Sequence, residues 1–195
     1  MQGNQQDAYH NSGMRLFVGI PLAAVVVDEL SATSMRLQSG GNGLRWSAPE
    51  SWHISLQFLG NTDREQYDRT VARLHKIHLP PVPIWLEKLG FFDRAGIVFA
   101  GVRLAPELLL LQERVTAATE LCGFAPESRP YRPHITLARS KGKGQRQALR
   151  ELTTEMHPQP NFTKFVAEEF LLYESFLGPA GSHYETRDCF PLNGR

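Results

Sequence analysis

The sequence lacks the features that mark membrane, secreted and metal-cluster proteins. Its longest apolar stretch, residues 17–27, is about half the length of a membrane-spanning helix and contains Pro21. Residues 1–13 are polar, so we interpret them as a disordered tail and not as a secretion signal. Cys122 and Cys189 are the only cysteines, too few for a disulfide framework or a cysteine-rich metal cluster. We therefore expect a cytoplasmic protein without a membrane segment.

An excess of either charge is also missing. The 195 residues include 21 basic and 20 acidic side chains, which gives a formal net charge of +1. A protein that coats duplex nucleic acid by bulk electrostatics needs more positive charge than this. The balance leaves room for a local basic pocket that binds a small anion or the end of an RNA. Because 42% of the residues are hydrophobic, the chain can bury a core, and we expect residues 14–195 to form a single domain.

Turn-forming and apolar residues predict a mixed order of strands and helices. We expect helices from Pro21 to about Gly40, from a capping box at 62–65 to Pro80, from Pro106 to Gly123, and over 145–155. We expect strands over 15–20, 52–59, 82–92, 97–104, 134–138, 165–173 and 183–190, the last two as a pair. This order is neither a strict alternation of strands and helices nor all strand, so the predicted fold class is α+β.

One tetrapeptide pattern occurs twice, 81 positions apart: His53-Ile54-Ser55-Leu56 and His134-Ile135-Thr136-Leu137. On a β-strand, successive side chains point to opposite faces. Each motif therefore buries its isoleucine and leucine in a core and presents an imidazole and a hydroxyl on the other face. If the two strands face each other, two imidazoles lie across a cleft, each with a hydroxyl beside it.

Two imidazoles and two hydroxyls suit acid–base chemistry on a phosphodiester. A neutral histidine can take a proton from a nucleophile while a protonated one gives a proton to the leaving oxygen. The hydroxyls can donate to the other phosphate oxygens. Because neither motif contains Asp, Glu or Cys, we expect no metal and no cofactor at the site. The alternative is that both histidines are ordinary structural residues of strands.

Longer segments around these motifs resemble the 2H phosphoesterase superfamily. They are most similar to its bacterial and archaeal RNA 2′,3′-cyclic phosphodiesterase branch, the LigT-like or 2′-5′ RNA ligase family. The resemblance extends over nearly the whole chain from Met14 and is carried by the segments RLFVGI at 15–20, WHISLQFLG at 52–60, RPYRPHITLAR at 129–139 and LYES at 172–175. It implies a bilobal fold with two pseudo-symmetric antiparallel sheets, flanking helices and a central cleft. It also implies metal-independent opening of a 2′,3′-cyclic phosphate at an RNA 3′ end to give a 2′-phosphomonoester.

The resemblance also implies a role for each site residue. His53 would be the acid for the leaving 3′ oxygen and His134 the base for water, while Ser55 and Thr136 would hold the phosphate. Arg139 would pair with the phosphate.

Phe58 would stack on the terminal base. Phe58 and Arg139 each follow their histidine by five residues, an odd offset that points to the opposite face of an ideal strand. Both side chains can reach the cleft only if the strand ends or bulges there.

The sequence leaves open the direction of the reaction, whether the chain is catalytic, and the role of a basic segment. The same site could ligate RNA 2′-5′ by the reverse reaction, or the chain could be a non-catalytic module that binds RNA ends. We expect a monomer that acts on RNA with a 2′,3′-cyclic phosphate end or on a cyclic nucleotide. Residues 129–150 hold seven basic and no acidic side chains, which form either a funnel for RNA phosphates or a solvated surface.

Overall fold

The computed structural model describes residues 13–38, 44–140, 152, 159–178 and 181–194. Residues 1–12 of the predicted tail at 1–13 and most of the predicted helix at 145–155 lie outside the described residues. In chain order the elements are β1 (Met14–Pro21), α1 (Ala24–Gln38), β2 (Arg45–Trp46), β3 (His53–Thr62), α2 (Arg64–Leu74), β4 (Val82–Ile84), β5 (Leu86–Phe92), β6 (Ile97–Val102), α3 (Pro106–Glu120), β7 (His134–Arg139), β8 (Phe165–Ala167), β9 (Glu169–Gly178) and β10 (Gly181–Pro191). The predicted α+β class is confirmed.

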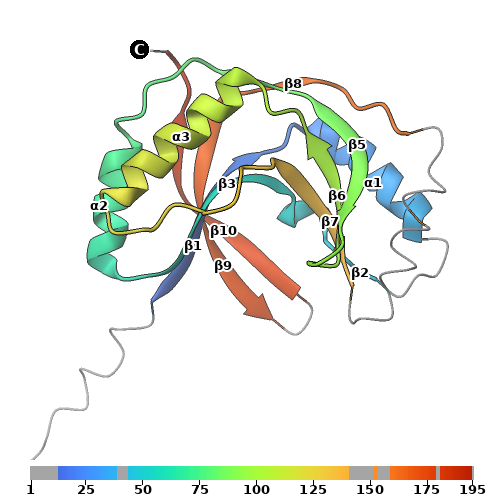
Figure 1. Ribbon diagram of the computed structural model, residues 1–195, viewed down its shortest axis with the longest axis horizontal. Coiled ribbons are helices and arrows are strands. Elements are labelled where there is room, and N and C mark those ends of the chain that lie inside the picture. The colour runs from blue at the N-terminus through green and yellow to red at the C-terminus, as the bar shows by residue number, and fades with distance from the viewer. Residues whose placement is uncertain (1–12, 39–43, 141–151, 153–158, 179–180, 195) are drawn as a thin grey trace, which may run out of the picture.

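The strands form two four-stranded sheets and one short pair. The first sheet has the order β10-β9-β1-β3, the second has the order β2-β7-β6-β5, and β4 pairs with β8. All of these pairings are antiparallel. The first sheet joins strands from both ends of the sequence, so the two sheets interleave along the chain. Figure 1 shows α2 and α3 together on one side of the molecule and α1 on the other.

A shared core positions the two motif strands. Ile54 and Ile135, the second residues of the two motifs, are fully buried in one cluster that includes side chains from both large sheets. Leu56 and Leu137 are buried in the same cluster. The expected burial of the apolar half of each motif is confirmed, and it leaves the histidines and hydroxyls to the other side. The helices in the described part of the chain fall short of the length and apolar character that a membrane span requires.

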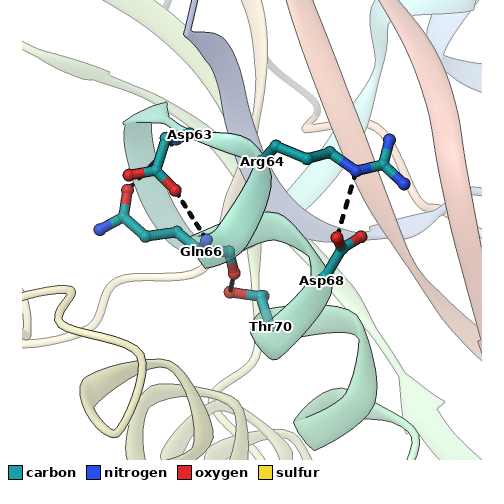
Figure 2. Close-up of polar contacts among 5 residues, drawn as sticks. All are labelled: Asp63, Arg64, Gln66, Asp68 and Thr70. Carbon is teal, nitrogen blue, oxygen red and sulfur yellow. Dashed lines mark hydrogen bonds and ion pairs between the residues drawn. The ribbon is translucent and has the colours of Figure 1, made fainter.

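The start of α2 differs in detail from the predicted capping box. Asp63, and not Thr62, is the N-cap: its carboxylate accepts from the backbone N–H of Gln66 at 2.8 Å, and the Gln66 side chain accepts from the backbone N–H of Asp63 at 3.2 Å (Figure 2). Arg64 and Asp68 add an ion pair at 3.2 Å one turn apart. The helix ends at Leu74, six residues before Pro80, so the proline does not end it.

Two predicted strands are divided in the structure. The predicted strand at 82–92 breaks at Trp85, because β4 pairs with β8 while β5 pairs with β6 in a different sheet. The backbone carbonyl of Trp85 instead accepts from the N–H of Arg103 at 2.9 Å. The predicted strand at 165–173 divides in the same way into β8 and β9, and only β9 pairs with β10. Local apolar pattern does not show when a chain crosses from one sheet to another.

Candidate active site

The motif strands β3 and β7 contact each other and line a single cavity of about 1150 Å³. β3 is the edge strand of the first sheet, and β7 is the second strand of the other. The structure brings all six predicted site residues to this cavity: His53, Ser55, Phe58, His134, Thr136 and Arg139. Two strands that are 81 positions apart in the sequence therefore present their polar residues to one space.

The imidazole of His53 is held in one tautomer. Its Nδ1 lies 2.8 Å from the backbone carbonyl oxygen of Ser51, and a carbonyl only accepts, so Nδ1 carries the proton. The other nitrogen, Nε2, lies 3.0 Å from the hydroxyl oxygen of Ser55, within the cavity. The rings of Phe17 and Tyr184 pack against the imidazole with centroid distances of 4.6 and 5.1 Å. Nε2 is therefore the nitrogen available for proton transfer.

His134 repeats this arrangement on the opposite strand. Its Nδ1 lies 2.8 Å from the backbone carbonyl oxygen of Arg132, again two residues earlier in the chain. Phe92 and Phe99 contact the ring edge-on at centroid distances of 4.9 and 5.5 Å. The site therefore contains two histidines with the same fixed tautomer, each supported by its own set of aromatic rings.

Burial and positive charge both favour the neutral imidazoles. The pKa of His53 is lowered to about 4, mainly by desolvation and also by the charges of His134 and Arg139, against the hydrogen bond to Ser51. Desolvation also lowers the pKa of His134, with a smaller contribution from Arg139. Arg139 lines the same cavity as both imidazoles, so its positive charge is available to an anion that binds there. At pH 7 and without a ligand, both histidines are neutral.

A register shift in each strand resolves the odd offsets of Phe58 and Arg139. Along β1 and β3, Gly19 pairs with Ser55 and Val18 with Gln57, so Leu56 is an extra residue. Along β6 and β7, Phe99 pairs with Thr136 and Val98 with Ala138, so Leu137 is an extra residue at the matching position. One extra residue turns an offset of five into an effective offset of four, and a β-bulge produces this change of face. The predicted interruption of the strands is therefore present in both.

The family model of the 2′-5′ RNA ligase superfamily matches residues 26–173 of the chain. The protein belongs to this superfamily. An RNA 2′,3′-cyclic phosphodiesterase of Archaeoglobus fulgidus is 29% identical over 182 residues, which are 91% of this chain and 99% of the relative. An Escherichia coli protein of the same name is 27% identical over 175 residues, 87% of this chain and 92% of the relative. The resemblance stated from the sequence is confirmed.

Two solved structures resemble this chain over nearly its whole length. A Thermus thermophilus protein is 27% identical, with a TM-score of 0.75 over 93% of this chain and 99% of its own. Escherichia coli LigT, solved as a complex with 3′-AMP, is 23% identical, with a TM-score of 0.76 over 93% of this chain and 99% of its own. This chain therefore shares its overall fold with both solved structures.

Sequence reasoning missed three residues that shape the site. The hydroxyl of Tyr131 donates to the backbone carbonyl of Ser55 at 3.0 Å and so joins β3 to the segment that leads into β7. The buried amide of Gln57 donates to the carbonyl of Ala125 at 3.2 Å and accepts from the Thr116 hydroxyl at 3.1 Å. These bonds join residues 59 to 76 positions apart, and no local pattern in the sequence signals such pairs.

Gly19 is the third missed residue. A Cβ atom at this position would lie 3.0 Å from the carbonyl oxygen of Ile54 and 3.3 Å from Cδ2 of His53, closer than most side chains tolerate. Its place in the RLFVGI segment was a signal, because glycine in a strand often marks a close approach of other groups. Gly19 therefore makes room for the His53 ring.

Proposed function

We propose that this protein hydrolyses the 2′,3′-cyclic phosphate at an RNA 3′ end and produces a 2′-phosphomonoester. One observation carries the proposal: two histidines with the same fixed tautomer line one cavity from two different sheets, each on a strand with a hydroxyl residue. In-line displacement at phosphorus needs an acid and a base on opposite sides of the reacting atom, and two histidines from two different sheets suit these positions. The names of the Archaeoglobus and Escherichia coli relatives support the same reaction.

The reaction needs two proton transfers and no other reactant than water. Nε2 of His134 takes a proton from water as the water oxygen bonds to phosphorus. The bond between phosphorus and O3′ breaks, and Nε2 of His53 donates a proton to O3′. The products are a 2′-phosphate and a free 3′-hydroxyl, and the two histidines exchange protons with solvent to return to their starting states.

The other site residues bind the phosphate and the nucleoside. Ser55 and Thr136 donate to the non-bridging oxygens, and the guanidinium of Arg139 neutralises their charge. Phe58, whose side chain is 67% exposed, offers a face on which the terminal base stacks. A base on the His53 side places the ribose against His53, which makes that residue the donor to the leaving oxygen.

His53 can act as the acid only if the bound substrate raises the pKa of its imidazole, so that the imidazole is protonated. With a pKa of about 4, His53 is neutral in the unliganded protein at pH 7. The negative charge of a bound cyclic phosphate stabilises an imidazolium beside it and raises that pKa. We therefore expect kcat/KM, which reports the free protein, to be highest below pH 6.5, because the pKa values of both free histidines are lowered.

The decisive experiment is turnover of 2′,3′-cyclic AMP followed by chromatography against 2′-AMP and 3′-AMP. We expect 2′-AMP, at a rate that excess EDTA changes by less than about twofold, because we assign no step to a metal. In the described residues, no group of three His, Cys, Asp or Glu side chains is placed to hold a metal ion. A mainly 3′-AMP product would overturn the assignment of His53 as the acid. Loss of activity on chelation, restored by a divalent ion, would overturn the two-histidine mechanism.

The reverse reaction at this site is ATP-independent 2′-5′ ligation of RNA ends. Comparing rates on cyclic phosphate and on cleaved RNA halves separates the two activities. A non-catalytic RNA-end binding module would show binding and no turnover. Both histidines and all the phosphate-binding residues come from one chain, so we propose that a monomer is sufficient, and an RNA-end substrate favours a cytoplasmic location.

A further inference from the structure

A second cavity, of about 480 Å³, lies between α2 and α3, and we call it the α2–α3 groove. Its polar lining is basic: Arg73, Lys76, His78 and Arg114. Its apolar lining includes Ile77 and Leu121, and the Leu121 side chain is 66% exposed. None of the described residues that line the groove is Asp or Glu. A protein with a net charge of +1 thus concentrates positive charge at this place.

The two arginines of the groove differ from those at the other end of α2. Arg64 and Arg69 form ion pairs with carboxylates one turn away, at 3.2 and 3.6 Å. Arg73 and Arg114 have no acidic residue three or four positions before or after them in the sequence. No carboxylate among the described residues lies within ion-pair distance of Arg73 or Arg114.

The helix dipole explains only part of this charge. Cations near the C-terminus of a helix are favoured, which accounts for Arg73 in the last turn of α2 and for Lys76 just beyond it. Arg114 lies in the interior of α3, so it gains nothing from that effect. α2 and α3 therefore each direct an arginine that has no ion-pair partner among the described residues to one groove, an arrangement that suits a polyanion.

The groove adjoins the active-site cavity across α3. Ala117 lines both, and its small side chain lowers the surface of the helix between them. Glu113 and Glu120, each about one turn from Ala117, line the active-site cavity, so the phosphates of a strand that crosses α3 must keep away from these two carboxylates. A helix is about 10 Å across, a span that a few nucleotides cover.

We propose that the α2–α3 groove binds the sugar-phosphate backbone of the RNA substrate a few nucleotides before its 3′ end. The phosphates lie against Arg73, Lys76 and Arg114, and the sugars and bases contact Ile77 and Leu121. The inference rests on the proposed function, because it takes the strand held in the groove to be the one whose end reaches the histidines. It adds that the protein prefers RNA chains of more than about four nucleotides to cyclic mononucleotides.

The test compares two double variants that each remove two arginines. Arg73→Ala with Arg114→Ala removes both arginines of the groove, and Arg64→Ala with Arg69→Ala, both in α2 and outside the groove, is the matched control. Leu121→Glu adds a negative charge at a position that is 66% exposed and therefore removes little packing, so it covers the case in which the first variant folds poorly. Each protein is assayed on 2′,3′-cyclic AMP and on a single-stranded RNA 12-mer with a cyclic phosphate end. Fluorescence anisotropy measures binding of the 12-mer across a salt series.

We expect the groove variants to raise KM for the 12-mer about tenfold at low salt and to leave cyclic AMP turnover within twofold of wild type. The slope of log affinity against log salt should fall by about 0.7 for each lost phosphate contact. Unchanged affinity for the 12-mer, or an equal loss in the control, would overturn the proposal. Absence of turnover in the wild-type protein would overturn the proposed function instead, while anisotropy would still report on the groove.

Discussion

The two motif strands share a backbone and differ in their surroundings. In β3 and β7 alike, the histidine donates from Nδ1 to the carbonyl two residues earlier, at 2.8 Å, and the motif leucine is the extra residue of a register shift. β3 lies at the edge of its sheet, however, and β7 lies between two strands. Beyond the shift, β3 presents Phe58 and β7 presents Arg139.

The comparison separates what the chemistry requires from what recognition requires. Proton transfer needs an imidazole in a fixed tautomer on each side, and here the two strands are alike. Binding one nucleotide in one orientation needs asymmetry, and the strands differ at the fourth effective position after each histidine. A repeated backbone device with different side chains thus gives a near-symmetric acid–base pair an asymmetric substrate site.

The largest expected effect tests whether the histidines of both motif strands act in proton transfer. His53→Ala and His134→Ala should each lower turnover of 2′,3′-cyclic AMP by about 10²–10⁴-fold, the usual loss of a general acid or base. Both variants should stay folded at neutral pH, because neither histidine belongs to the buried hydrophobic cluster that forms the core. Steady-state kinetics and urea unfolding measure the two quantities. His183→Ala, an exposed histidine outside the cavity, is the control. Near-full activity of either site variant would remove that histidine from the mechanism.

The loss of stability at acid pH tests whether burial keeps the His53 imidazole neutral. Its pKa is about 4 when folded and about 6.5 when unfolded, so the unfolded chain binds the proton more readily. The neutral form therefore stabilises the fold above pH 6.5, and this contribution is lost as the pH falls from 6.5 through 4. The difference corresponds to about 3 kcal/mol of unfolding free energy. His53→Gln does not titrate, so its loss of stability between pH 7 and 4 should be smaller by about that amount.

Urea unfolding at the two pH values measures this difference. His134→Gln should change the pH dependence in the same direction, because burial lowers the pKa of that histidine too. If His53→Gln lost as much stability on acidification as the wild type, His53 would not be held neutral by its surroundings.

Arg139 tests the side of the comparison that binds the phosphate. Arg139→Ala should lower kcat/KM roughly 10- to 150-fold. This corresponds to about 1.5–3 kcal/mol of binding free energy, the range for a hydrogen bond to a charged group. The control is Arg45→Ala, because Arg45 pairs with Arg139 in the sheet and does not line the cavity. An equal loss in both variants would mean that a diffuse positive field binds the phosphate.

Phe58 tests the side that binds the base. Phe58→Ala should raise KM for 2′,3′-cyclic AMP about 5- to 150-fold. This corresponds to about 1–3 kcal/mol, the usual contribution of stacking one base on an aromatic ring. A cyclic phosphate of ribose without a base should show no such change. Phe176→Ala, an aromatic residue of β9 outside the cavity, is the control. A similar loss on the substrate without a base would place Phe58 in phosphate binding or in folding.

The residues of the site were predictable because each motif combines chemistry with a period of two. The alternation at 53–56 and 134–137 gives the buried and the cleft-facing sides, and the resemblance supplies the pairing of the strands. The alternation of apolar and polar residues does not reveal the register shifts at Leu56 and Leu137. A shift depends on how the neighbouring strands pair, and it decides whether Phe58 and Arg139 reach the cavity.

The features that the sequence did not predict are those set by distant parts of the chain. The break at Trp85 arises because β4 pairs with β8, about eighty residues later in the chain, so the apolar run at 82–92 is not one strand. The bond between Tyr131 and Ser55 joins segments 76 positions apart. Position along the sequence carries no information on such pairs until the topology is known.

The smallest expected effect tests whether the two strands act as one unit. Tyr131→Phe removes only the hydroxyl that donates to the Ser55 carbonyl, and a hydrogen bond of this kind contributes about 0.5–1.5 kcal/mol. Thr70→Val is the matched change, because it removes a buried hydroxyl that donates to the Gln66 carbonyl within α2, outside the cavity. We expect both variants to lose similar stability in urea unfolding. Tyr131→Phe alone should lower turnover, by about 2- to 10-fold, since Ser55 lies 3.0 Å from Nε2 of His53. Equal turnover in the two variants would show that this bond holds the fold together and does not position the acid.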